Sequence, residues 1–190
     1  MKIVCLFGSP RLKGNSYTLA KIFCDRAQEL GAKIQTFTLN KLTYQGCQAC
    51  MACKTKLDHC ILSDDLTEVL KAVAKAEVLV MATPTYYGEV SSQLKAFIDR
   101  TYSYLVPDFT TNPAPSRLSP GKRMVFIQTQ GYPDESYYAD VFPRYANFFK
   151  WYGYEESHII RACGVSTPED LKKQKETLNQ ARQTAELLIK

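Results

Sequence analysis

Three short apolar runs constrain the fold of this chain more than any other feature of its sequence. They are Ile3–Phe7, Val78–Ala82 and Met124–Gln128, and β-branched or large side chains dominate each of them. Near-continuous apolar runs of this length are typical of strands that are covered on both faces, as in a parallel sheet. Two weaker runs, Lys33–Leu39 and His158–Cys163, are predicted to be further strands.

Helical patterns fall between these runs and after the last of them. Thr167 and Pro168 supply a cap and a first-turn proline for the final helix. The strict alternation of strands and helices predicts right-handed crossovers and a doubly wound sheet. We therefore expect one domain over residues 1–190, an α/β fold with five parallel strands in the order 2-1-3-4-5 and helices on both faces. The predicted helices cover Ser16–Leu30, Asp65–Lys75, Ser91–Leu105, Ser136–Tyr152 and a final stretch from Thr167 to Leu188.

One long segment, Val106–Arg123, fits neither pattern. It contains four prolines and shows no hydrophobic periodicity. Because it is long for a connection between a helix and a strand, we interpret it as a functional flap or an interface loop.

Composition and charge exclude several classes of protein. Hydrophobic residues make up 45% of the 190, which excludes a disordered chain, and the net charge of +5 is scattered, which argues against nucleic-acid binding. No apolar stretch approaches the roughly 18 residues of a membrane span, and the first residues lack the layout of a signal peptide. Seven cysteines, four of them within fourteen residues, argue against a secreted disulfide framework. We expect a cytoplasmic protein without a membrane or nucleic-acid partner.

The loop after the first strand, Gly8–Ser16, has the composition of an anion site. In doubly wound sheets, ligands bind beyond the carboxyl ends of the strands where the strand order reverses, here between the first and third strands. The backbone amides of this loop and the helix start that follows it suit a phosphate, and Arg11 adds positive charge. The glycine pattern is neither that of a P-loop nor that of a dinucleotide fingerprint, and the alternative is a capped loop with a basic tip. Hydroxyl and amide groups come from Ser9, Asn15, Ser16 and Thr18.

The loops after the third and fourth strands are expected to border the same cleft. Tyr86 and Tyr87 offer flat surfaces for stacking against a flavin, and Gly88 permits close backbone approach to a ligand. An aromatic packing corner is the alternative interpretation of these tyrosines. After the fourth strand, Thr129–Tyr132 presents backbone groups that suit the polar edge of a flat heterocycle. The three loops together predict a flavin site.

Four cysteines follow the second strand with the spacing C-x2-C-x2-C-x6-C, namely Cys47, Cys50, Cys53 and Cys60. Soft thiolates suit iron-sulfur clusters or zinc, and the first three resemble the bacterial ferredoxin run that wraps one [4Fe-4S] cube. Zinc sites usually use two separated pairs, so iron-sulfur is the better prediction for a metal. Reversible disulfides, free thiols and a cluster that is lost in oxygen are the alternatives. Because this loop follows the strand next to the first, we expect it beside the flavin site, close enough to exchange electrons.

The chain resembles the flavodoxin-like, NADPH-dependent FMN reductases over roughly residues 1–165. The resemblance is carried by the segments GSPRLKGNS, TPTYYGEVSSQLKAFIDR and TQGYPDE. Within that family, GCQACMACKTKLDHC followed by SDDL resembles the iron-sulfur flavoproteins, which carry a compact cysteine motif after the second strand. The loop Val106–Arg123 departs from the shorter versions expected in the family.

The resemblance implies an FMN site and a set of residues that hold the cofactor. It also implies a [4Fe-4S] cluster on Cys47, Cys50, Cys53 and Cys60, and a homodimer or homotetramer with flavins near the subunit interfaces. Because the cofactor carries the chemistry, no catalytic side chain is predicted. The residues that the resemblance assigns are Ser9, Arg11, Asn15, Ser16 and Thr18 for the phosphate, Pro84, Thr85, Tyr86, Tyr87 and Gly88 for the ribityl chain and isoalloxazine, and Thr129, Gln130 and Gly131 for the pyrimidine side of the ring.

Three functions follow from these predictions. The first is an electron-transfer flavoprotein with FMN and a [4Fe-4S] cluster, which passes electrons between a small-molecule or protein donor, such as a ferredoxin-like protein, and an acceptor. The second is an NAD(P)H-dependent reductase of FMN or quinones whose cysteines hold no metal. The third is a redox sensor in which flavin or thiols report the redox state. The cysteine spacing favours the first, and the second stays open because a nicotinamide can stack on FMN without a Rossmann motif.

Overall fold

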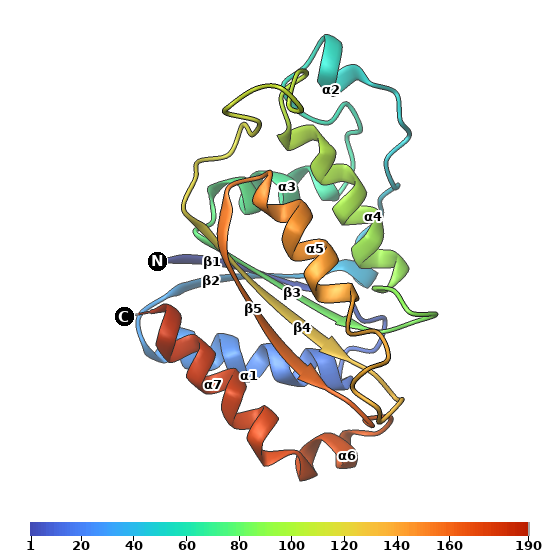
Figure 1. The fold of residues 1–190 in the computed structure, drawn as a ribbon, viewed down its shortest axis with the longest axis vertical. Helices are drawn as coiled ribbons and strands as arrows, with labels where there is room; N and C mark the ends of the chain where they lie inside the picture. Colours follow the sequence, from blue (N-terminus) through green and yellow to red (C-terminus); the bar gives the residue numbers. More distant parts are fainter. Residues whose placement is uncertain (190) are drawn as a thin grey trace.

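Five parallel strands form the centre of the molecule, and the computed structural model describes residues 1–189 (Figure 1). The strand order is β2-β1-β3-β4-β5, and every neighbouring pair is parallel. The predicted fold class and strand order are therefore confirmed, with the order reversing between β1 and β3. The strands are β1 (Lys2–Phe7), β2 (Lys33–Thr38), β3 (Val78–Pro84), β4 (Lys122–Thr129) and β5 (Tyr154–Ala162).

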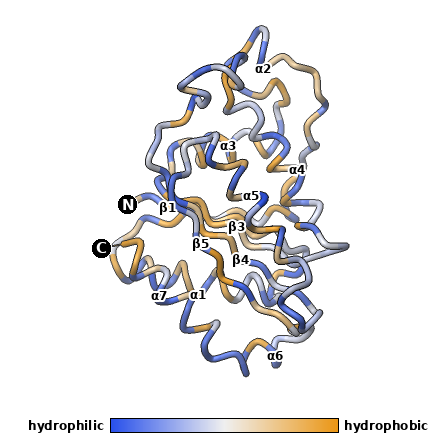
Figure 2. Tube along the Cα trace, in the orientation of Figure 1, coloured by the Kyte–Doolittle hydropathy of each residue, from blue (hydrophilic) through white to orange (hydrophobic). Residues whose placement is uncertain are grey.

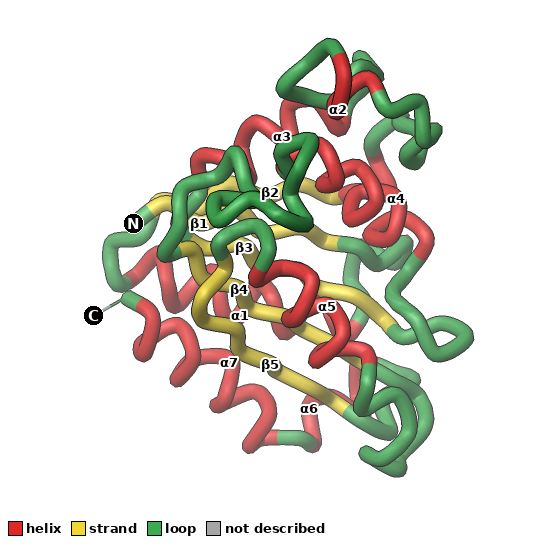
Figure 3. The backbone as a smooth tube through the Cα atoms, turned by 45° about the horizontal axis from the view of Figure 1, so that its top comes forward, coloured by secondary structure: helices red, strands yellow, loops and turns green. Residues whose placement is uncertain are grey.

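Helices cover both faces of the sheet. Helices α1 and α7 pack on one face, and α3, α4 and α5 pack on the other, while the short α2 lies beyond the end of α4 (Figures 1 and 3). None of the helices in the described part of the chain is both long and apolar enough to cross a membrane. Their bounds are α1 (Asn15–Glu29), α2 (Ala52–Thr55), α3 (Leu66–Lys75), α4 (Ser92–Arg100), α5 (Val141–Lys150), α6 (Pro168–Lys173) and α7 (Lys175–Leu188), with the 3-10 turns η1 (Leu39–Lys41) and η2 (Thr101–Tyr104).

Two hydrophobic cores, one on each face, explain the near-continuous apolar runs. In β1, Val4 and Leu6 join the core beneath α3, α4 and α5, whereas Ile3, Cys5 and Phe7 join the core beneath α1 and α7. Successive side chains of a strand point to opposite faces, so a strand buried on both faces needs an apolar residue at every position. Figure 2 shows the hydrophobic residues concentrated along the central strands. The edge strand β2 is only partly buried, which explains why its run is the less regular one.

Helix lengths are where the structure departs from the sequence-based expectation. The helix expected from Ser136 starts only at Val141. In the turn before it, the carbonyl oxygens of Glu135 (2.8 Å) and Tyr137 accept from the guanidinium of Arg161 instead of from helical N–H groups. The last helix breaks at Gln174, whose side chain donates to a loop carbonyl, and continues as α7. The helix expected over Ser91–Leu105 is α-helical only to Arg100 and then tightens into η2.

Candidate functional site

A cavity of about 280 Å³ lies where β1, β3 and β4 end. It is the place at which doubly wound sheets bind ligands, beyond the carboxyl ends of the strands at the reversal of strand order. The structure thus brings the three loops singled out in the sequence to one cleft. Most of the predicted cofactor residues line the cavity, namely Ser9, Arg11, Asn15, Ser16, Pro84, Thr85, Tyr86, Thr129 and Gly131.

The first loop ends in a helix start that no side chain caps. Gly14 is the N-cap of α1 and carries no side chain to accept from the first-turn amides, so those N–H groups point into the cavity region without a cap. Asn15 Oδ1 is buried without a hydrogen-bond partner among the described residues. A Cβ at Gly14 would lie 3.3 Å from Ser9 Oγ, so the glycine keeps this cradle open. Thr18 does not line the cavity, and its hydroxyl donates to Gly14 O (3.1 Å) within the first turn of α1.

Two positive side chains flank this helix start. Arg11 and Lys13 are exposed at the cavity, and within residues 1–189 neither forms an ion pair. Helix N-termini attract anions through free amides and the helix dipole, and the two cations add to that potential. The loop therefore suits a phosphate.

The second loop is a tight turn fixed by backbone hydrogen bonds. Tyr86 and Glu89 exchange N–H to carbonyl bonds of 2.9 and 3.0 Å, and Tyr87 (φ 50°) and Gly88 (φ 77°) both adopt left-handed backbone at the tip. Such a turn strongly favours glycine at its second central position. Tyr86 lines the cavity, whereas the ring of Tyr87 is fully exposed and Gly88 does not reach the cavity wall.

The third loop contributes through its backbone and through Gly131. Thr129 O accepts from Thr85 N (2.7 Å), which ties the second and third loops together. Gln130 is buried and fully engaged within its own region, since its N–H donates to Ala162 O and its side chain to Tyr132 O. The structure therefore places Gln130 behind the cavity wall as a support.

Residues of a fourth loop also line the cavity and were not anticipated from the sequence. They follow β5, at the same edge of the sheet, where Gly164 turns the chain with φ 68° and Thr167 caps α6. The predicted fifth strand was the signal that could have indicated this loop, because the carboxyl ends of all parallel strands lie at the same edge of the sheet. The lining residues of this fourth loop are Val165, Ser166 and Pro168, and Lys13 and Gly14 of the first loop line the cavity as well.

The four motif cysteines gather around a second, much smaller cavity of about 20 Å³. Cys47, Cys50, Cys53 and Cys60 all line it. No group of three or more His, Cys, Asp or Glu side chains within residues 1–189 is arranged to hold a single metal ion. The four cysteines thus line one cavity, but their side chains are not close enough together to hold a single metal ion.

The backbone between these cysteines is strained. Ala49 (φ 51°) and Met51 (φ 58°) both adopt left-handed conformations, although neither is glycine. Across the described structure, no backbone N–H from Gly46 to Cys53 donates to a protein acceptor. Successive N–H groups beside left-handed residues form concave sites that bind anions, including iron-sulfur clusters.

The structure corrects the expectation that the cysteine segment lies beside the flavin loops. The chain leaves β2 and follows α4 from its first turn, where Tyr44 OH donates to Gln93 O (3.0 Å), to its last, where Arg100 Nη1 donates to Gln45 O (2.9 Å). The flavin loops contact the start of α4, since Ser91 Oγ donates to Gly8 O (2.6 Å). The nine residues of α4 make the helix about 13.5 Å long, at about 1.5 Å per residue, and the two segments contact its opposite ends.

Two cations, Lys54 and Arg117, contact the ends of the cysteine segment or the residues beside it. Lys54 is buried and donates to Tyr102 O and Leu105 O (both 2.6 Å), and burial lowers its pKa. Arg117, from the proline-containing segment, donates from Nη2 to Cys53 O (3.1 Å). The segment predicted as a flap or interface loop therefore supports the cysteine motif.

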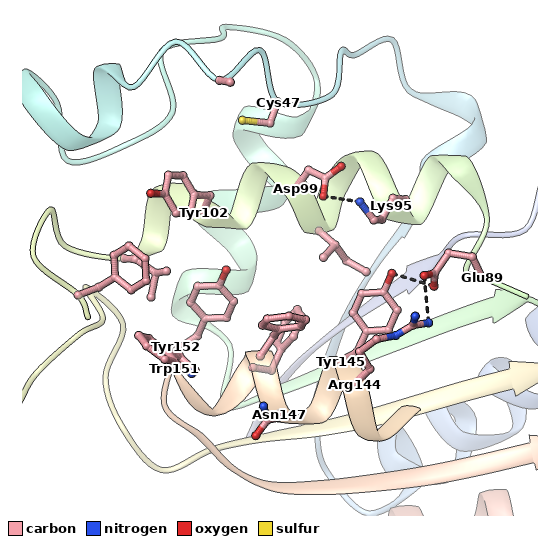
Figure 4. Close-up of a pocket in the computed structure, with 16 residues that line it drawn as sticks. Cys47, Glu89, Lys95, Asp99, Tyr102, Arg144, Tyr145, Asn147, Trp151 and Tyr152 are labelled. Carbon is pink, nitrogen blue, oxygen red and sulfur yellow. Dashed lines mark hydrogen bonds and ion pairs between the residues drawn. The ribbon is translucent and has the colours of Figure 1, made fainter. Parts of the chain in front are cut away.

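A groove of about 790 Å³ runs between α4 and α5, from Glu89 after the second loop to Cys47 of the cysteine motif (Figure 4). Glu89 lies at one end, where it accepts from Tyr145 OH (2.9 Å) and pairs with Arg144 (3.1 Å), and Cys47 lies at the other. Aromatic side chains form much of the wall between them, and Phe148 is 58% exposed. Exposed aromatic side chains gathered along one groove suit contact with another molecule.

The sequence model of the NADPH-dependent FMN reductases matches residues 1–135. The chain belongs to this family. At the level of the family, the predicted enzyme class, a flavin-dependent oxidoreductase, is confirmed. Iron-sulfur flavoproteins of Methanocaldococcus jannaschii and Methanosarcina thermophila are each 33% identical over 101 residues, 53% of this chain and 52% of theirs. The chain thus spans about half the length of these curated relatives.

Solved structures support the fold of this FMN reductase family member over its whole length. An FMN-dependent NADH-azoreductase from Bacillus anthracis, in complex with FMN, superposes with a TM-score of 0.77 at 19% identity and covers 100% of both chains. An NAD(P)H:quinone oxidoreductase from Methanothermobacter marburgensis gives 0.76 at 17% identity and covers 99% of this chain and 96% of its own. At this level of identity the likeness concerns the fold.

Proposed function

We propose that the protein is an FMN-containing oxidoreductase that exchanges electrons between FMN and a [4Fe-4S] cluster held by its four motif cysteines. The observation that carries the flavin part is the uncapped start of α1, where the buried Asn15 Oδ1 has no partner among the described residues. A buried acceptor without a donor is costly, so a bound group that offers a hydroxyl to Asn15 Oδ1, as the ribityl chain of FMN does, would stabilise the site.

The residues around the cavity fit FMN by their chemistry. The phosphate would take the first-turn amides of α1, the hydroxyls of Ser9 and Ser16 and the charge of Arg11. The remaining wall, formed by the loops after β3, β4 and β5, offers Tyr86 and backbone groups to a flat heterocycle. Bound FMN would supply hydride and single-electron chemistry, and these residues would bind and orient it.

The cysteine segment fits an iron-sulfur cluster better than a single ion. The cube of a [4Fe-4S] cluster spaces its four thiolates more widely than one tetrahedral ion does, in keeping with four cysteines that line one cavity without forming an ion site. The left-handed residues Ala49 and Met51 turn unbonded N–H groups toward the place that an anionic cluster would occupy. Lys54 and Arg117 offset part of the negative charge.

A second candidate function is an NAD(P)H-dependent reductase of quinones or similar acceptors whose cysteines carry no metal. The observation that favours it is the full-length likeness in fold to an azoreductase and a quinone oxidoreductase, whereas the iron-sulfur relatives match only about half their length. In both candidates the chain acts as one domain, and the seven cysteines suit the reducing cytoplasm.

Flavin, iron and sulfide content after anaerobic purification separates the two candidates. The first predicts about one FMN, four irons and four sulfides per chain. Cys50→Ser should lose the iron and keep the flavin, whereas the matched control Cys163→Ser, which changes a thiol outside the motif, should keep both. Flavin without iron, together with fast NADPH oxidation, supports the second candidate. Absence of flavin contradicts both.

We also propose that a second copy of the chain covers the groove between α4 and α5, in a homodimer or homotetramer. The groove is apolar and aromatic along its wall, while its charged groups are already paired within the chain, Glu89 with Arg144 and Lys95 with Asp99. Such a surface has little to offer a charged partner and suits apolar self-association. Sedimentation velocity measures the oligomeric state directly.

A further inference from the structure

Arg100, the last residue of α4, has its side chain wholly buried against the cysteine cavity. Its exposed side-chain fraction is 0%, and it lines the same cavity as the four motif cysteines. An arginine is almost never buried in full unless each part of its guanidinium has a partner. The partners of Arg100 therefore indicate what the residue does.

The guanidinium joins the two flanks of the cysteine motif. Nη1 donates to Gln45 O (2.9 Å), two residues before Cys47, and Nη2 donates to Leu62 O (3.1 Å), two residues after Cys60. Both nitrogens also donate to the carboxylate of Asp64, at 2.8 and 3.3 Å. Arg100 thus fixes the relative position of the segment that carries the first three cysteines and the segment that carries the fourth.

One donor of the guanidinium is left over. An arginine has five N–H donors, and the four hydrogen bonds above use those of Nη1 and Nη2. Nε–H is buried and has no acceptor within residues 1–189. Cys60 is the motif cysteine that shares both of its cavities with Arg100, the one of about 20 Å³ and a neighbouring one of about 220 Å³.

We propose that Arg100 is a positioning residue for the cluster and that its Nε–H donates a hydrogen bond to the thiolate sulfur of Cys60. The inference rests on the proposed [4Fe-4S] cluster and adds a residue outside the cysteine motif to that site. On reduction the cluster gains one electron and no proton, so its thiolates become more negative. A hydrogen bond and a positive charge at a thiolate stabilise that reduced form and raise the reduction potential.

The main test compares Arg100→Lys with the matched control Arg26→Lys after anaerobic purification. The lysine keeps the positive charge but lacks Nε and the planar fork that reaches both flanks. We expect the electron affinity of the cluster to fall about tenfold, a midpoint potential about 59 mV lower, because a tenfold change in a one-electron equilibrium corresponds to 59 mV. Arg26 lies on α1, on the other face of the sheet, and pairs with Glu29 and Glu186, so its variant should keep the wild-type potential.

A second measurement needs no variant and so stands even where Arg100→Lys does not fold. Wild-type protein labelled with guanidino-15N arginine is reduced, and electron-nuclear double resonance is recorded on its cluster. We expect a coupling from one arginine 15N and from its exchangeable proton, which disappears on exchange into deuterium oxide.

The outcomes separate this inference from the proposed function. Wild-type protein without iron and sulfide refutes the cluster itself. Wild-type protein that contains the cluster but shows no arginine 15N coupling, with a potential that Arg100→Lys leaves unchanged, refutes the role of Arg100 and leaves the cluster in place.

Discussion

The ion pair between Asp64 and Arg100 gives the sharpest test of how the cysteine segment is held. The carboxylate of Asp64 accepts from Arg100 Nη1 (2.8 Å) and Nη2 (3.3 Å), from Gln45 N (3.1 Å) and from Leu66 N (3.1 Å). Asp64→Ala removes all four bonds at once and leaves the guanidinium of Arg100 buried without a counter-charge. The cysteine segment, α3 and α4 lose their shared anchor together.

The magnitude follows from the burial of the two partners. Removing one partner of a buried ion pair costs about 3–5 kcal/mol. The side chain of Arg100 is 0% exposed but that of Asp64 is 17% exposed, so water replaces part of the loss and the lower end of this range applies. We expect Asp64→Ala to reduce the free energy of unfolding by about 3 kcal/mol. For a chain of this size that corresponds to a melting temperature about 6–12 °C lower.

Urea unfolding, monitored by circular dichroism, measures this difference in the free energy of unfolding on protein from which metal and flavin have been removed. The control is Asp99→Ala, which removes a neighbouring acid of α4 whose partner is Lys95. Both members of that pair are more than 40% exposed, so its loss should cost less than about 1 kcal/mol. Equal, small losses for the two variants would show that Arg100 is not held by Asp64.

The pH dependence of the free energy of unfolding tests the same ion pair, because the pKa of Asp64 predicts the direction of the change. Burial acts to raise the pKa of Asp64, but the hydrogen bonds from Arg100 and Gln45 pull it below its usual value. A lowered pKa in the folded state contributes stability that is complete above the unfolded pKa of about 3.9 and disappears as the pH falls through the folded value. Between pH 7 and pH 3, the wild type should therefore lose more stability than Asp64→Ala. An equal acid dependence of the two proteins would contradict the assignment.

Four further predictions concern other parts of the structure. Gly8→Ala places a Cβ 2.9 Å from that of Leu94 and 3.0 Å from Ala82 O, and should cost about 1–3 kcal/mol in chemical unfolding. Arg11→Ala should reduce the preference for FMN over riboflavin about tenfold in fluorescence titrations, since it removes a charge from the proposed phosphate site and none from the ring site. Phe148→Asp should convert the proposed oligomer into monomers in sedimentation velocity, and an unchanged mass would place the interface elsewhere. Thr167→Ala removes the capping box at α6 and should cost about 1 kcal/mol in thermal unfolding, with no loss if the cap is replaced by water.

The arrangement of the sheet could be predicted because burial on both faces leaves a direct mark on the sequence. Val78–Ala82 and Met124–Gln128 are apolar at nearly every position, and their side chains fill the cores on both faces of β3 and β4. Once the strand order follows, the loops after β1, β3 and β4 have to meet, so most of the cofactor residues could be named from chain position alone.

Features set by tertiary hydrogen bonds could not be predicted in the same way. The place of Gln130 after β4 does not reveal that its side chain donates to Tyr132 O and its backbone N–H to Ala162 O. The cysteine segment was expected beside the flavin loops, but contacts to Gln93 and Arg100 carry it along α4 to the opposite end. These contacts join residues about 50 positions apart, and no local pattern records them.

The position of the cysteine segment determines how far electrons would travel between the flavin site and the cysteines of one chain. The two sites contact opposite ends of α4, and the groove beside this helix has Cys47 at one end and Glu89 at the other. A second copy seated in that groove would cover both residues.

Low-temperature electron paramagnetic resonance of the anaerobically purified protein, reduced with NADPH, tests the central claim most directly. The account predicts that the flavin absorbance bleaches and that the signal of a reduced [4Fe-4S] cluster appears with it, because electrons that enter through the flavin reach the cluster. Cys50→Ser should bleach in the same way and give no cluster signal. A wild-type protein whose flavin bleaches without any cluster signal, even after reduction with dithionite, would contradict the claim.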